Sequence, residues 1–135
     1  MKIRVVSSKD EIDSLSKSEK ILHLTFRPSN KDIFDLIQKC PEVKAIHMPG
    51  SYLKTISDST KMLLDMQGVS FLEGDIWGHR KDINEYYEIK QEAFDTIEEL
   101  KKEGLSEAEI LKRMKRTFRL SKDLLQFLMK GKKKK

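Results

Sequence analysis

The chain is 135 residues long, which is typical of one domain or of one domain with a small appendage, and 38% of its residues are hydrophobic against 36% charged. The formal net charge is +5, and the single cysteine, Cys40, excludes an internal disulfide and a thiolate metal cluster. The apolar patch in MKIRVVSSKDE is too short for a signal peptide and no run could span a bilayer, so we expect a cytoplasmic protein with no transmembrane segment.

Four short apolar runs predict β-strands, because each is rich in β-branched or aromatic residues and is bounded by turn formers. The runs are Ile3–Val6, Ile21–Phe26, Val43–Met48 and Val69–Leu72. A polar element follows each run: Ser8-Lys9-Asp10, Asn30-Lys31-Asp32, Leu53-Lys54-Thr55 and Arg80-Lys81-Asp82. Asp or Thr just before an apolar-periodic stretch is typical of a helix N-cap, so a helix is expected after each run.

This repeated unit of strand, turn and helix predicts an α/β fold. Connections of this length imply right-handed crossovers, and therefore a small parallel sheet of about four strands built from βα units over residues 1–82. One face of the sheet is strongly apolar, while the other, which carries His23, Thr25 and His47, is only half so. Either most helices lie on one face, or the C-terminal helices cover the weaker face incompletely.

The remaining chain predicts a three-helix segment over residues 83–131 and a basic tail over 132–135. From Asn84 the pattern is helical for some twenty residues, includes Tyr86 and Tyr87, and ends at Gly104, a glycine expected just beyond the helix. Ser106 opens a capping box for the second helix, and Ser121 caps the last one.

Two parts of this segment resemble the paired helices of helix-turn-helix DNA-binding domains. They are Gly104-Leu105-Ser106-Glu107-Ala108-Glu109-Ile110 and Leu120-Ser121-Lys122-Asp123-Leu124, similar in the Gly-Leu-Ser opening, the Glu-Ile pair and the Leu-Ser that starts the second helix. The gap between the two serines is about one helical turn longer than usual and holds no glycine, which would move the second helix from its position in the major groove.

The whole chain also resembles a small family of uncharacterised archaeal proteins, found mainly in methanogens and classed as a domain of unknown function. The stretches that carry this resemblance are FRPSNKDIFDL, GDIWGHRKDINEYYE and EGLSEAEI. The resemblance implies an archaeal cytoplasm and brings no activity with it.

The loops after the strands are candidates for a ligand site, because ligands of parallel sheets gather at the carboxyl edge, near helix N-termini. Hydroxyls, cations and two aromatic rings there suit a phosphate-bearing small molecule: Arg27, Ser29, Lys31, Ser51, Tyr52, Trp77, His79 and Arg80. The alternative is that these residues only cap helices and that GDIWGHRKDI is a structural junction. No glycine-rich phosphate motif can be written through these loops.

The two repeat histidines, His23 and His47, are expected on neighbouring strands, about 5 Å apart if those strands pair. Without a third ligand they favour a hydrogen-bonded structural pair over a metal site, and we predict neither a metal nor a cofactor. No set of residues identifies a catalytic centre, so enzymatic activity stays uncertain.

The charge is divided unevenly along the chain, which suggests a polyanionic partner for one end. Residues 104–135 hold eleven Lys or Arg against three acidic residues, whereas residues 1–103 hold sixteen against nineteen. We therefore expect a protein that binds nucleic acid, either DNA or RNA, and a role as a regulator is one form that this function could take. Its phosphate contacts are expected from Lys112, Arg113, Lys115, Arg116, Arg119, Lys122, Lys132 and Lys133. The alternatives are a small α/β enzyme or ligand sensor using the loop edge, and an interaction module for an acidic protein or an anionic membrane surface.

Overall fold

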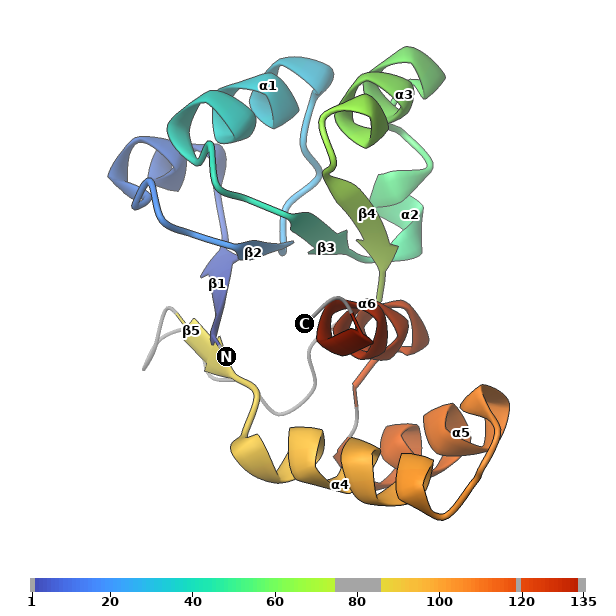
Figure 1. The fold of residues 1–135 in the computed structure, drawn as a ribbon. Coiled ribbons are helices and arrows are strands. Elements are labelled where there is room, and N and C mark those ends of the chain that lie inside the picture. The colour runs from blue at the N-terminus through green and yellow to red at the C-terminus, as the bar shows by residue number, and fades with distance from the viewer. Residues whose placement is uncertain (1, 75–85, 119, 134–135) are drawn as a thin grey trace.

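A computed structural model describes residues 2–74, 86–118 and 120–133, the last four by their backbone alone. Its centre is a five-stranded sheet in the order β4-β3-β2-β1-β5 (Figure 1). The strands are β1 (Lys2–Val6), β2 (Ile21–Leu24), β3 (Ala45–Met48), β4 (Ser70–Glu73) and β5 (Tyr86–Glu88). The helices are η1 (Lys9–Ser14, a 3₁₀ helix), α1 (Asn30–Lys39), α2 (Gly50–Leu53), α3 (Asp58–Met66), α4 (Gln91–Lys102), α5 (Glu107–Phe118) and α6 (Lys122–Lys133).

The first four strands are parallel, as the βα repeat predicted. The residues that begin the helices are different from those predicted, because serine takes the cap position. Ser29 Oγ accepts the Asp32 amide and the Asp32 carboxylate accepts the Ser29 amide, so Asp32 is the third residue of a capping box and not its cap. Likewise Ser8 precedes η1, and Ser57 caps α3, so Thr55 lies between two helices. The cap predicted at Asp82 lies outside the described residues.

The helix predicted from Asn84 is wrong at its start. Residues Tyr86–Glu88 form β5, which pairs antiparallel with β1, and α4 begins only at Gln91. Aromatic side chains favour strands, and the Tyr86 hydroxyl donates a 2.7 Å hydrogen bond to the buried Glu19 carboxylate. This bond fixes Tyr86 beside the edge of β1, where a helix could not pair with the strand.

Both faces of the sheet are covered, each by its own apolar core. On one face Leu22, Leu24, Ile46 and Met48 pack with residues of η1, α1 and α3. On the other, residues of β1 to β4 pack with α4, α5 and α6, and this core includes Ile97, Met114 and Leu124. The C-terminal helices therefore cover the face that the sequence showed to be less apolar. Gly104 follows α4 with a φ of 82°, in the conformation expected of a glycine beyond a helix end.

Helix α6 lies between the sheet and the other C-terminal helices (Figure 1), with contacts to both β4 and α5. Ser121, Leu124 and Leu125 are buried there. No helix of the described residues is both long and apolar enough to cross a membrane.

Candidate functional site

One exposed surface of the C-terminal helices gathers cationic side chains. Ile110 and Met114 turn one side of α5 into the core, which leaves the basic residues of the following positions outward. The first turn of α6 adds one more lysine beside them. We call this set the cationic face: Lys112, Arg113, Lys115, Arg116 and Lys122, all exposed.

The charge of the cationic face is not neutralised by the ion pairs found among the described residues, since these join other groups. Two hollows flank Lys112 on this surface. One, of about 510 Å³, is lined by Lys112, Lys115 and Lys122 together with Glu107 and residues of the α5–α6 contact. The other, of about 600 Å³, is lined by Glu109, Lys112, Arg113, Arg116 and Thr117. Cations outnumber carboxylates in both hollows, so each favours an anion.

Of the residues predicted to bind nucleic acid, the structure brings five together as the cationic face. Arg119 lies outside the described residues. Lys132 and Lys133 belong to the last turn of α6, where only the backbone is described. Sequence reasoning missed Gln126, which shares the hollow with Lys122 and lies one helical turn beyond it.

A buried hydrogen-bonded chain ties the start of α6 to the sheet. His23 and His47 are partners in the β2–β3 register, as expected, and their Nδ1 atoms lie 2.7 Å apart. His47 Nε2 lies 2.8 Å from Ser121 Oγ, which also accepts the Leu124 amide at 3.3 Å. Ser121 Oγ therefore joins the first turn of α6 to His47, and the His47 ring joins Ser121 to His23.

A serine, a histidine and a second histidine in a chain also match the logic of a nucleophile, its base and a group that orients the base. Ser121 is only 4% exposed and lines neither of the two hollows of the cationic face. Its oxygen is occupied as the cap of α6. The arrangement therefore joins two parts of the fold and offers a substrate no access to the hydroxyl.

Two further contacts hold the same end of α6. The Asp123 carboxylate accepts the Glu73 amide at 2.8 Å, beside the end of β4. Gly74 follows with a φ of 151°, and a Cβ at this position would collide with the Ser121 side chain and with His47 Nε2. Only glycine allows the strand end to approach the helix this closely. The first turn of α6 is thus fitted to the sheet at three points.

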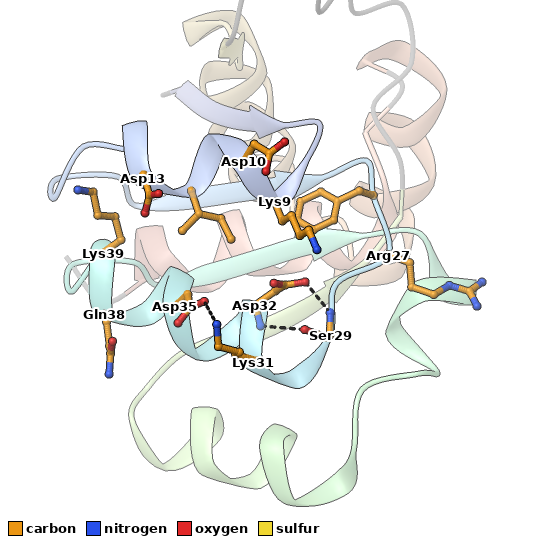
Figure 2. A pocket seen from close by; sticks show the side chains of 12 residues that line it. Lys9, Asp10, Asp13, Arg27, Ser29, Lys31, Asp32, Asp35, Gln38 and Lys39 are labelled. Atoms are coloured by element: carbon orange, nitrogen blue, oxygen red, sulfur yellow. Dashed lines mark hydrogen bonds and ion pairs between the residues drawn. The ribbon is translucent and has the colours of Figure 1, made fainter.

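A third hollow, of about 1250 Å³, lies between η1 and α1. Figure 2 shows that Lys9, Asp10 and Asp13 lie across it from Asp32 and Asp35. Four cations (Lys9, Arg27, Lys31, Lys39) and four carboxylates (Asp10, Asp13, Asp32, Asp35) line it, and Lys31 forms an ion pair with Asp35 at 3.7 Å. This balance gives the hollow little preference for an anion.

The predicted ligand residues are only partly brought together. Arg27, Ser29 and Lys31 line that hollow, but Ser29 serves as the α1 cap and the Arg27 guanidinium is turned away from the carboxylates (Figure 2). Arg27 instead lies over the Tyr52 ring, with 5.5 Å from Cζ to the ring centroid. Ser51, on α2, does not line the hollow. Trp77, His79 and Arg80 lie outside the described residues.

The titration of the single thiol gives no sign of a reactive site. Cys40 is fully buried at the end of α1, and burial raises the pKa of its thiol to about 11. A thiol with so high a pKa is protonated near neutral pH and is a poor nucleophile. No cluster of three His, Cys, Asp or Glu suited to a metal ion is found among the described residues.

Comparison with known proteins identifies both parts of the chain. Residues 2–85 match the N-terminal domain of a family of unknown function, DUF1699, and residues 92–130 match its C-terminal helix-turn-helix domain. Neither the curated proteins nor the solved structures gave a match. The resemblances to an uncharacterised family and to helix-turn-helix domains are thus confirmed, while the archaeal source and the cytoplasmic location stay predictions. The match to the N-terminal domain alone covers more than half of the chain, and the chain therefore belongs to the DUF1699 family.

Proposed function

We propose that the protein binds nucleic acid, DNA or RNA, through phosphate contacts made by its cationic face. The observation that carries the proposal is that five exposed cations gather on α5 and the start of α6, within a helix-turn-helix domain, and make no ion pair within the described part of the chain. Cations on one helical face are the electrostatic footprint expected for a phosphate backbone.

The energetics of such binding come mainly from counterion release, and they predict a steep dependence on salt. Each neutralised phosphate of duplex DNA contributes about −0.9 to the slope of log affinity against log salt concentration, so five contacts predict a slope of about −4.5. Arg119 and the C-terminal lysines, which the sequence also assigns to the interface, would make the slope steeper.

The test is fluorescence anisotropy with a labelled duplex and a labelled single-stranded RNA over a series of salt concentrations. Replacing Lys112 and Arg116 with glutamine preserves helix propensity and removes two contacts, so the slope should become shallower by about 1.8 and affinity at about 0.1 M salt should fall about 50-fold. The matched control is Lys17→Gln with Lys54→Gln, two exposed lysines outside both hollows of the cationic face.

The control variant should retain the slope of the unmodified chain. A slope near zero, no binding at low salt, or an equal loss in both variants would refute the proposal. Flotation with anionic vesicles tests the alternative that the cationic face binds a membrane surface. Binding to vesicles without binding to nucleic acid would favour that alternative over the proposed function.

A second candidate function is the binding of a small phosphate-bearing ligand in the hollow between η1 and α1. It is favoured by one observation, that Arg27, Ser29 and Lys31 line the same hollow. The equal number of carboxylates there argues for weak binding. Titration with inorganic phosphate and with a nucleotide, followed by amide NMR, should shift the amides of these three residues; unchanged amides at millimolar ligand would exclude the site.

A further inference from the structure

The helix-turn-helix domains that read DNA sequence do so with their second helix, which lies in the major groove and directs its N-terminal residues to the base edges. The sequence resemblance pairs α5 with α6 within the matched domain, so α6 is the counterpart of that second helix. Whether α6 can reach bases therefore decides what kind of nucleic-acid target the protein can recognise.

The sheet occupies the end of α6 that would have to face the bases. His47 and Glu73 hold its first turn through Ser121 and Asp123, and Gly74 packs directly against Ser121. Helix α5 covers another side of α6. The buried residues of α6 (Leu124, Leu125, Leu128, Met129) belong to the core that the sheet shares with all three C-terminal helices.

Among residues 122–129 of α6, four are buried and three are half-buried, which leaves one exposed side chain. Lys122 is exposed and Gln126 is half-buried, and both line a hollow whose other wall is α5, with Lys112 and Lys115. The major groove is about 12 Å wide, and an α-helix with its side chains has a diameter of about 10–12 Å, so a helix must protrude to enter it. A concave surface between two helices cannot enter a groove, but it can hold the protruding phosphates of a backbone.

We infer that α6 is a structural helix, that the cationic face holds the phosphate backbone, and that the protein binds nucleic acid without reading its base sequence. This inference rests on the proposed function and names its target class as any nucleic acid of suitable backbone shape. This binding mode differs from that of the usual helix-turn-helix, because in this chain the N-terminal sheet packs against the first turn of α6, which would otherwise contact the DNA.

The first test is selection of bound duplexes from a pool with a randomised central segment, using the full chain at low salt. We expect no enriched sequence motif and affinities for AT-rich, GC-rich and mixed duplexes that agree within about threefold, against the 10³-fold or larger preference typical of specific binders. An enriched motif bound about 100-fold more tightly would overturn the inference and leave the proposed function standing. Absence of binding to any nucleic acid would refute the proposed function and the inference with it.

The second test asks whether α6 stays on the sheet in the complex, without any substitution that could unfold the chain. Amide hydrogen exchange of Leu124, Leu125 and Leu128 is measured with and without a saturating duplex. We expect protection to be retained or increased in the complex, because the cationic face binds with α6 in place. A loss of protection on binding by about tenfold or more would show that α6 is released to reach the duplex, and would overturn the inference.

Discussion

The contact between α6 and the sheet can be measured through Ser121→Ala. This substitution removes the cap of α6, which costs about 1 kcal/mol, and it removes a hydrogen bond from His47 Nε2 at a buried position, which costs a further 1–3 kcal/mol or so. Together these give about 2–4 kcal/mol. With an unfolding entropy of about 0.28 kcal/mol/K for a chain of this length, the melting temperature should fall by about 7–14 °C.

The matched control for this prediction is Ser106→Ala. Ser106 caps α5 by accepting the Glu109 amide at 3.3 Å, but it is exposed and has no partner on the sheet among the described residues. Its replacement should cost about 1 kcal/mol, or about 3–4 °C. Thermal and urea unfolding followed by circular dichroism measure both variants. If Ser121→Ala costs no more than Ser106→Ala, the hydrogen bond to His47 does not hold α6 to the sheet and the reasoning fails.

Three other predictions use the same structure. Gly74→Ala should destabilise the fold by about 2–3 kcal/mol in urea unfolding, because the added Cβ would meet the Ser121 side chain. The control is Gly68→Ala, which should cost about 1 kcal/mol because Gly68 has a φ of 81° but open space around it. Equal losses in the two variants would contradict the close approach of Gly74 to Ser121. Asp123→Ala should cost about 1 kcal/mol by removing the acceptor of the Glu73 amide, and it should leave the salt slope of nucleic-acid binding unchanged; a steeper slope would mean that α6 release aids binding. Cys40 should react with a thiol reagent at pH 8 at least about 100-fold more slowly in the folded chain than in urea, because burial raises its pKa to about 11 from an ordinary 9.0. The free energy of unfolding should also fall as pH rises from 9 to 11, since the thiol of the unfolded chain ionises first. Rapid labelling of the folded chain would contradict the burial of Cys40.

The parallel part of the sheet could be predicted because its central strands, β2 and β3, are buried on both faces and so read as largely apolar runs. The fifth strand could not. Tyr86 and Tyr87 fit a helical period together with the residues of α4, and a short apolar pair is compatible with either structure. Their actual environment is set by Glu19 and β1, which are distant in sequence.

The composition of the cationic face follows from helical periodicity, which already places Lys112, Arg113, Lys115 and Arg116 opposite the apolar stripe of α5. The packing of the first turn of α6 against the sheet does not follow from helical periodicity. It depends on His47 and Ser121, which are 74 positions apart, and periodicity reports only which side of a helix is buried and not what covers it. The one sequence signal was the matched position of His23 and His47 in consecutive repeats, which predicted their pairing but not the serine that completes the chain.

The most direct measurement of the central claim is an amide NMR titration of the full chain with a short duplex at low salt. We predict that shift changes concentrate on residues 112–117 and on Lys122, with no change at Arg27, Ser29 and Lys31, which line the hollow between η1 and α1. Shifts that concentrate at that hollow, or that leave α5 unchanged while the duplex binds, would contradict the assignment of the cationic face as the nucleic-acid interface.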